Sequence, residues 1–593
     1  MLISPLKNIK YFIKWAQSKL TKKQFIFLSS ILVGLSAGLA AILLKTIVHS
    51  IFYLATYDKL SNFSYLYLVL PVIGIFLTVF VIKRLFGGEM EKGLAQVHYA
   101  IAKKSSLMKR SKMFDQVITS SLTVGFGGSV GLEAPIVITG AAIGSNYSKN
   151  YHLNYNERTL LLACGVSAGI GAAFNAPIAG VLFALEVLLL DISISAFTPL
   201  ILAAATGALI SKIVLNENIL LFFQLKNSFN YANVPFYALL GVLAGFIAVY
   251  HARTVNRIES FFSRFKNRIY VRVFLGGLLL ALLIAVFPSL FGEGYQSIKS
   301  LASSQPNDLL ENSIFSDYKF NQWFVLFFIG ILFLLKAVAT GITLGAGGNG
   351  GNFAPSLFVG AYLGYFFSKS LNLLNITSLP VNNFTLVGMA GILSGLYHAP
   401  LTAIFLIAEI TGGYTLMIPL MIVSSISFAI ARYFEPFSMD TKKIAASGDL
   451  FTNDRDQNVL MTIKIETFIE KDYPVLLPDF NLGKLVAIIS NSKRNVFPVV
   501  DVSGNLTGLV LLDDVREIMF KKDFYAKILV KELMIKPAYK IETIQGMTEV
   551  MSIFDESEAW ALPVTEGGKY VGFISKSIIF NGYRSKLKMA KIE

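Results

Sequence analysis

The chain has 593 residues, of which 54% are hydrophobic and only 15% are charged, and its mean hydropathy is +0.61. A soluble protein of this length and composition would precipitate, so most of the chain is predicted to lie in a lipid bilayer. The net charge of +15 does not indicate a nucleic-acid binder, because the lysines and arginines lie mostly at loops and at the ends of apolar segments.

The first 23 residues carry six lysines and are followed by an apolar run without a clear cleavage site. We interpret residues 1–23 as a cytoplasmic N-terminal segment and not as a cleaved signal peptide. Runs that are long enough to span a bilayer, or part of one, follow at residues 25–44, 66–82, 273–287 and 324–335. The sequence therefore predicts a multi-pass protein of the plasma (cell inner) membrane.

Two stretches of the chain repeat each other 220 positions apart. GFGGSVGLEAPIVITGAAIG at residues 125–144 matches GAGGNGGNFAPSLFVGAYLG at residues 345–364. Farther along, FNAPIAGVLFALE at residues 174–186 matches YHAPLTAIFLIAE at residues 397–409. Repeated apolar segments interrupted by glycine are typical of transporters whose site forms between two inverted halves. We predict an all-α polytopic membrane domain of two inverted repeats with broken helices, covering residues 24–434, with repeats at about 24–215 and 232–434.

Glu133 is the only charged residue between positions 116 and 148, and it stands in a glycine-rich break just before an apolar helical run. A lone carboxylate in a membrane is costly unless it is protonated or partnered, so it is a functional candidate. The glycines before it leave backbone amides uncovered, and a helix that starts near Pro135 directs its free N–H groups toward the break. The pattern predicts an anion site built from backbone amides.

The second repeat has the same construction, with Phe353 at the position of Glu133 and no charge between residues 337 and 368. In inverted halves both helix starts would point at one midplane site. Partial charges suit a transported anion because they attract it without holding it as tightly as a full charge. Protonation of Glu133 is then expected to open the path.

Other matched residues favour structural roles. Glu186 and Glu409 each stand alone in an apolar run, and we interpret them as carboxylates that bind backbone groups and lock each repeat. His398, which matches Asn175, is expected to fix a helix end. The spacing of four glycines favours close helix packing, at Gly140, Gly144, Gly360 and Gly364.

The hydrophobic character stops at Arg432, and a soluble α/β region follows. FPVVD and GNLTG at residues 497–508 recur as LPVTE and GKYVG at residues 562–572. This repeat resembles a tandem pair of CBS domains, whose two copies pack face to face because one copy is too small to bury its own sheet. The expected segments are a linker at 435–464, a first CBS copy at 465–522 and a second at 530–585.

In CBS domains that bind adenine nucleotides, a glycine, a hydroxyl residue and an aspartate at fixed spacing hold the phosphates and the ribose. The first copy has Gly508 and Asp514 but lacks the hydroxyl, and the second has Gly572 and Ser575 but lacks the acid. These four positions are candidate adenine-nucleotide ligands. A structural or dimer-supporting role for the pair is the alternative, and we favour it.

The membrane motifs resemble those of the CLC family of chloride channels and chloride/proton exchangers, and with the CBS pair the resemblance covers nearly the whole chain. GLEAP at residues 131–135 resembles the family's GREGP motif, and GNFAP at residues 351–355 resembles its GxFxP motif. The resemblance implies a homodimer with one pore per subunit, chloride as the transported ion, no required cofactor, and Glu133 as the gating glutamate. It also implies an anion-binding set, at Gly131, Leu132, Glu133, Ala134, Asn352, Phe353, Ala354 and Gly88.

The sequence departs from the family pattern at the inner mouth of the path. The serine that contacts chloride in the family falls on Gly88, and the inner tyrosine falls approximately on Asp440, so both hydroxyl donors are missing. Glu89 and Asp440 instead place acids there, which would repel an anion unless nearby lysines such as Lys442 neutralise them.

Val187 bears on the mechanism. In the family's exchangers a second glutamate usually follows the one that matches Glu186, and it relays protons; here that position is Val187, as is typical of the channels. We therefore favour channel-like permeation. Chloride/proton antiport is the alternative, because some exchangers lack this glutamate, and Glu89 or Asp440 would then be the substitute proton acceptor.

Other classes of protein fit the sequence less well. The sequence lacks HExxH and paired aspartates in apolar runs, so we expect neither a metal site nor an enzyme. A cation path should show converging carboxylates, whereas Phe353 occupies one of the two equivalent positions. The expected partners are an inorganic anion, the bilayer and a second copy of the chain.

Overall fold

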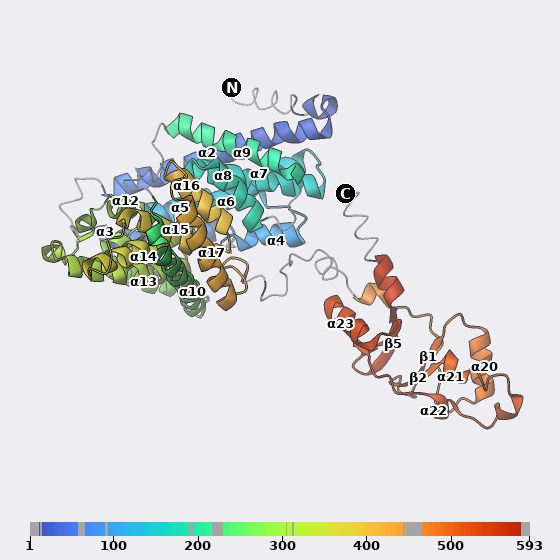
Figure 1. Ribbon diagram of the computed structural model, residues 1–593. Coiled ribbons are helices and arrows are strands. Elements are labelled where there is room, and N and C mark those ends of the chain that lie inside the picture. Colours follow the sequence, from blue (N-terminus) through green and yellow to red (C-terminus); the bar gives the residue numbers. More distant parts are fainter. Residues whose placement is uncertain are drawn as a thin grey trace. The chain divides into compact units, whose positions relative to one another are not determined.

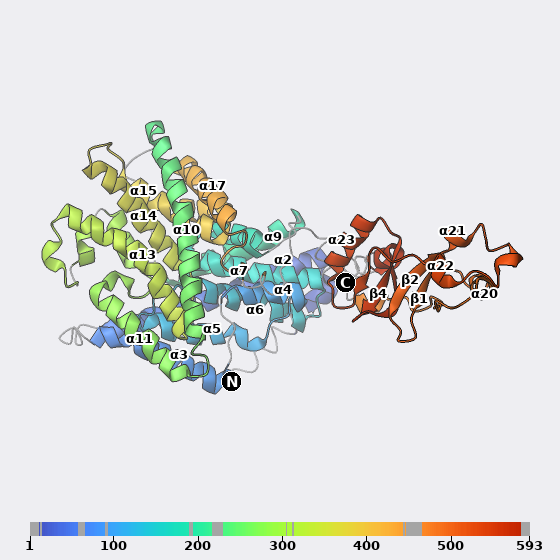
Figure 2. The ribbon, with the colours of Figure 1, turned by 90° about the horizontal axis from the view of Figure 1, so that it is seen from below.

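The computed structural model describes residues 11, 13, 15–56, 66–88, 93–188, 194–215, 229–303, 305–310, 313–442, 445 and 465–582. The chain divides into two compact units, residues 1–450 and 451–593. The first unit is a bundle of helices and the second is a smaller α/β unit (Figures 1 and 2).

The first repeat consists of helices and short turns up to α9. Its π-helical turn η3 continues α8 without a break. The elements are α2 (Lys22–Thr56), α3 (Leu66–Leu85), α4 (Ala95–Lys103), η2 (Arg110–Met113), α5 (Asp115–Gly125), α6 (Glu133–Asn150), α7 (Tyr155–Phe174), α8 (Pro177–Phe183), η3 (Ala184–Leu188) and α9 (Ile194–Leu215).

The second repeat begins at η4 and the long helix α10, and its helices follow the same order as those of the first repeat. Helices α13 to α17 correspond in sequence to α5 to α9. The elements are η4 (Tyr231–Asn233), α10 (Val234–Ser263), α11 (Ile269–Val286), η5 (Pro288–Leu290), α12 (Tyr295–Ala302), η6 (Pro306–Leu310), η7 (Ser316–Tyr318), α13 (Gln322–Ala346), α14 (Phe353–Leu373), α15 (Val381–Tyr397), α16 (Pro400–Ile410) and α17 (Met417–Phe434).

Among the described residues, eight helices are long and apolar enough to cross a membrane: α2, α3, α7, α9, α10, α11, α13 and α17. They differ in how far the protein covers them. In α7, 78% of the apolar window is buried, against 28% in α11, so α7 lies inside the bundle while this chain leaves most of the surface of α11 uncovered. The prediction of an all-α membrane domain with a C-terminal α/β region is confirmed.

Reciprocal hydrogen bonds join the two repeats. The Glu186 carboxylate accepts from the backbone N–H groups of Leu401 (3.1 Å) and Thr402 (2.8 Å) at the start of α16. The Glu409 carboxylate accepts from Ile178 (3.0 Å) and Ala179 (2.8 Å) at the start of α8. The predicted bonds to backbone are confirmed, but they join one repeat to the other and do not close each repeat on itself. Each glutamate thus caps a helix that would otherwise expose free N–H groups in lipid.

The equivalent helix ends are also alike. Asn175 ends α7 with φ 52°, and His398 ends α15 with φ 56°, both in the left-handed region. His398 therefore ends a helix, as the sequence predicted.

Glycines allow α6 to pack closely on α7 and α14 to pack closely on α15. A Cβ added at Gly144 would overlap the carbonyl oxygen of Leu161, and one at Gly364 would overlap that of Phe384. Gly140 and Gly360 make the same kind of approach one turn earlier. The prediction of a packing role for these glycines is confirmed.

The α/β unit contains two similar halves that exchange their leading segments. In the first half β1 (Val496–Val500) pairs with β2 (Leu506–Leu511), and in the second β4 (Ala561–Glu566) pairs with β5 (Lys569–Ser575). Glu470, ahead of the first half, pairs with Phe573 of the second, while Ile535 pairs with Leu509 of the first. The other elements are η8 (Ile465–Phe468), α20 (Leu482–Ser490), α21 (Leu512–Val515), η9 (Lys522–Phe524), α22 (Val530–Leu533), β3 (Ile541–Glu542) and α23 (Met547–Ser557).

The close approach of α14 to α15 predicts the effect of adding one methyl group. Gly364→Ala should lower the stability of the protein in detergent by about 1–3 kcal/mol, because the methyl group has no space against Phe384. The measurement is the fraction that stays monodisperse on size exclusion after heating. Gly413→Ala is the matched control, since its nearest neighbour would be 3.9 Å away. Equal loss of stability in both variants would contradict the packing role.

Candidate functional site

The two glycine-rich breaks meet in the membrane unit. Gly131 and Gly351 exchange both backbone N–H···O bonds, each 2.8 Å long, in an antiparallel bridge. Helix α6 begins at Glu133 and α14 begins at Phe353, each two residues after the bridge. The unpaired N–H groups of both helix starts are therefore brought to one place, as the sequence predicted for inverted halves.

Glu133 is buried at this junction, with 4% of its surface exposed. Its Oε1 accepts a hydrogen bond of 2.5 Å from the hydroxyl of Tyr295, the first residue of α12. A Cβ added to Gly131 would overlap Oε2 of Glu133 and lie 3.0 Å from the backbone nitrogen of Ala354. The glycine thus makes room for the carboxylate beside the first amides of α14.

The candidate anion-binding positions of both motifs lie at the same junction. Leu132 caps α6 and Asn352 caps α14, and neither helix start has a side-chain cap. The side chains of Ala134, Phe353 and Ala354 are all buried there. Among the described residues, the Glu133 carboxylate competes for these amides beside Ala354.

Phe353, at the start of α14 in the second repeat, lies in a cluster of aromatic side chains. Its ring centroid is 5.4 Å from that of Phe174, 6.2 Å from Phe183 and 5.6 Å from Tyr397. These rings come from the ends of α7, α8 and α15. The position equivalent to Glu133 is therefore enclosed by aromatic side chains.

The predicted inner-mouth positions lie in different surroundings. Gly88 is exposed, has φ 85°, and has open space where a side chain would stand. Asp440 is half-buried next to the end of α15, because the Met439 N–H donates to the Leu396 carbonyl (3.3 Å). Glu89 lies outside the described residues.

A lysine that the sequence offered as a neutralising charge has another partner. Lys442 forms an ion pair with Glu435, which also binds Arg253 at 2.6 Å. The charge of Lys442 is thus engaged at the end of α17.

Val187 is half-buried in the π turn η3, directly after the capping residue Glu186. Its side chain carries no titratable group. A proton relay at this position is therefore absent from the chain.

A cavity of about 950 Å³ opens beside Glu133, and we call it the Glu133 cavity. Lys45 of α2 lines it, and its ammonium binds the carbonyl oxygen of Ala173 at the end of α7. Glu293 and Tyr295 line it from the segment around the start of α12.

A buried lysine lies behind this cavity. Lys336 is fully buried in α13, and its ammonium donates to the Ser129 hydroxyl (2.8 Å) and the Gly292 carbonyl (2.9 Å). It also lies over the ring of Phe358, 4.9 Å from the centroid. Two hydrogen bonds and a cation–π contact compensate for the burial of this ammonium.

Sequence reasoning did not single out these groups around Glu133. Lys45, Glu293, Tyr295 and Lys336 come from segments outside the repeated motifs, and the structure alone places them near the junction. A signal existed for Lys336, which is the single charge within α13. Among the described residues, no group of three or more His, Cys, Asp or Glu side chains could hold a metal ion.

In the α/β unit, the chain itself covers the glycines of both candidate nucleotide motifs. A Cβ on Gly508 would be 2.8 Å from the sulfur of Met534, and one on Gly572 would be 2.6 Å from the Glu470 carbonyl oxygen. Asp514 is exposed on α21. The Ser575 hydroxyl donates to the Glu470 carboxylate at 2.7 Å.

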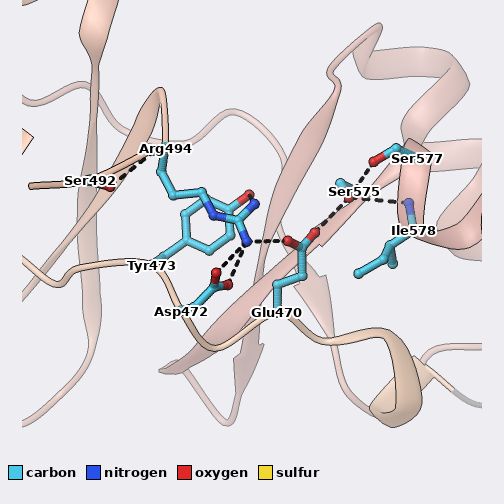
Figure 3. Close-up of polar contacts among 8 residues, drawn as sticks. All are labelled: Glu470, Asp472, Tyr473, Ser492, Arg494, Ser575, Ser577 and Ile578. Carbon is cyan, nitrogen blue, oxygen red and sulfur yellow. Dashed lines mark hydrogen bonds and ion pairs between the residues drawn. The ribbon is translucent and has the colours of Figure 1, made fainter.

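Arg494 connects the two halves of this unit (Figure 3). Its guanidinium lies 2.6 Å from Glu470 and 2.6 Å from Asp472, and it covers the ring of Tyr473 at 4.3 Å. Hydrogen bonds to Asp472 and then to Glu470 raise the pKa of Arg494 further above its ordinary value, and the same arginine holds the pKa of Asp472 below its usual range. The side chains near Ser575 thus form an internally paired network.

A duplicated bundle with glycine-broken helices meeting at a buried carboxylate defines a class of membrane transport protein. Residues 74–432 match the family described as "Voltage gated chloride channel", and residues 465–521 and 530–584 match the CBS domain. The chain belongs to this voltage gated chloride channel family, the CLC family, and carries two CBS domains. The resemblance inferred from the motifs is confirmed.

Curated relatives and solved structures agree with this assignment. The voltage-gated ClC-type chloride channel ClcB of Escherichia coli O9:H4 (strain HS) is 30% identical over 321 residues, which cover 53% of this chain and 71% of the relative. A slow cyanobacterial Cl⁻/H⁺ antiporter has a similar fold, with a TM-score of 0.62, 21% identity and coverage of 72% of this chain and 99% of that one. A eukaryotic CLC transporter has a TM-score of 0.59 at 20% identity, over 93% of this chain and 97% of that one.

The Arg494 network predicts that the α/β unit depends on this side chain. Arg494→Ala should lower the free energy of unfolding of residues 451–593 by about 1–2 kcal/mol, because it leaves the largely buried Glu470 without its charge partner. The measurement is urea unfolding followed by circular dichroism, with the exposed neighbour Lys493→Ala as control.

The same variant has a pH signature. Because the folded pKa of Asp472 lies below its unfolded value, its stabilising contribution is present above the unfolded pKa and is lost as the pH falls through the folded pKa. The difference between wild type and Arg494→Ala should therefore shrink in acid. A difference that grows in acid would contradict the role of Asp472.

Proposed function

We propose that this protein carries chloride-type anions across the membrane, through the junction of α6 and α14, and that Glu133 gates the path. The observation that supports this most directly is the buried Glu133 carboxylate at the paired glycine breaks, beside the Ala354 amide. A carboxylate in that position occupies the amides that an anion would use. Protonation or displacement of Glu133 frees them.

The surroundings favour an anion over a cation. Lys45 lines the cavity on one side, Lys336 lies behind it, and Phe353 takes the place of a second carboxylate in the other repeat. The names of similar proteins also refer to anions: chloride in the ClcB relative and the cyanobacterial antiporter, and fluoride in a CLC-type fluoride/proton antiporter of known structure. The binding residues in this proposal are the motif positions from Gly131 to Ala134 and from Asn352 to Ala354.

For the inner mouth we propose weaker selectivity for chloride. Gly88 supplies no hydroxyl and Asp440 carries an acid, so the anion meets fewer donors there. Tyr397, whose ring contacts Phe353, offers a hydroxyl close to the Asp440 segment.

For the mode of transport we favour passive conduction, because Val187 cannot relay a proton. Proton-coupled exchange is the second candidate, and the names of the antiporter neighbours favour it. In that case Asp440 or Glu89 would accept protons on the inner side.

We further propose a homodimer in the plasma membrane, with the CBS pair in the cytoplasm in a structural role. Exposed apolar side chains on α8, α9 and α16, such as Ile178, Ile201 and Leu401, are available for contact between subunits. Leu511 and Ile578 stand where a nucleotide site needs a hydroxyl and an acid, and Ser575 already binds Glu470. No cofactor is needed for this function.

Glu133→Gln tests the gate. The variant mimics the protonated carboxyl, so chloride efflux from proteoliposomes should rise several-fold near neutral pH and lose its dependence on pH. Glu157→Gln is the control, because glutamine also serves in the capping box of α7. Flux and pH response identical to those of wild type in Glu133→Gln would refute the gate.

The reversal potential separates the two modes of transport. Purified protein in liposomes under a fixed chloride gradient should give a potential that follows chloride alone, with or without an opposing proton gradient. A potential displaced by the proton gradient would establish exchange and overturn passive conduction.

A further inference from the structure

Glu293 is a second carboxylate in the Glu133 cavity. It lies outside the repeated motifs and has no role in the proposed function. It lies between η5 and α12, outside the eight candidate membrane spans, and part of its surface is open. Glu133, by contrast, is almost fully buried. Both acids line the cavity, and Glu293 is the more exposed of the two.

The loop that carries Glu293 is held against the first glycine break. Gly292 and Gly294 have φ of 66° and 90°, which glycine adopts without strain. The Gly292 N–H donates to the Gly127 carbonyl (3.0 Å), and Lys336 donates to the Gly292 carbonyl (2.9 Å). The position of Glu293 is therefore fixed relative to the start of α6.

Charged and polar groups face Glu293 from several elements. The Glu133 carboxylate repels its charge, while Lys45 from α2 and Lys336 from α13 attract it. The backbone amide of Leu132, at the start of α6, also faces its carboxylate. Glu293 thus stands at one of the amides that we propose for the anion.

Glu133 has a related set of neighbours. Tyr295 donates to it, Lys45 attracts it, and Tyr397 from α15 faces it. The other titratable side chains that line the cavity are His49, Lys299 and Asp308. The two carboxylates therefore share Lys45 within one partly closed space, where like charges favour uptake of a proton by one of the pair.

We propose that Glu293 is a positioning residue that sets the pH at which Glu133 opens the anion path. This proposal rests on the proposed function of Glu133. The negative charge of Glu293 makes Glu133 easier to protonate, and protonation removes one of the two charges that keep an anion away from the α6 amides.

Glu293→Gln in the full-length protein tests the proposal. The substitution removes the charge and keeps the shape, so Glu133 should hold its proton less tightly. The midpoint of the pH dependence of chloride efflux should move toward acid by about one pH unit, which is a tenfold change in proton affinity. Efflux is measured from proteoliposomes with the pH changed on each side separately. Asp308→Asn is the matched control, because this acid lines the same cavity but is exposed, so that solvent screens its charge.

The outcomes separate this inference from the proposed function. An acid shift in Glu293→Gln with an unchanged midpoint in Asp308→Asn supports the inference. An unchanged midpoint in Glu293→Gln, or an equal shift in Asp308→Asn, overturns it while Glu133→Gln remains independent of pH. A Glu133→Gln variant that keeps the wild-type pH response overturns both.

Discussion

The rest of the membrane unit depends on the pair of backbone hydrogen bonds between Gly131 and Gly351. In lipid, every N–H and C=O group needs a partner, so a helix can be broken at the midplane only where the protein supplies one. Here each broken segment supplies it to the other. The remaining free amides belong to the starts of α6 and α14, and they become available for a carboxylate or an anion.

The charges around this junction follow from the same constraint. A buried carboxylate or ammonium is tolerated only with close partners, and Glu133 has the Tyr295 hydroxyl while Lys336 has Ser129 and Gly292. The lysine stabilises the loop that carries Glu293, and Tyr295 ties the same loop to Glu133. Electrostatics and loop position are therefore linked: a change of charge at one carboxylate is felt by the groups that hold the other.

Sequence reasoning found the parts of the site that the duplication makes visible. Residues that match at separations of 220 and 223 positions identified both breaks, the packing glycines, and the glutamates of η3 and α16, because each has a counterpart with the same local chemistry. It did not find Tyr295 or Glu293, since both lie outside the repeated motifs and their approach to Glu133 depends on tertiary packing. It expected Glu186 and Glu409 to act within their repeats, because the crossing of α8 and α16 cannot be read from spacing along one chain.

Because Glu186 and Glu409 cap helices in each other's repeat, the two repeats of this single chain depend on each other as two different subunits would. Each repeat supplies the carboxylate that caps a helix in the other, so a substitution at either glutamate leaves backbone N–H groups at the start of a helix in the opposite repeat without their acceptor. Selection must therefore preserve the two halves together at these positions. At positions 133 and 353 no such exchange exists, and there the halves were free to diverge into a carboxylate and an aromatic ring, giving a symmetric scaffold an asymmetric gate.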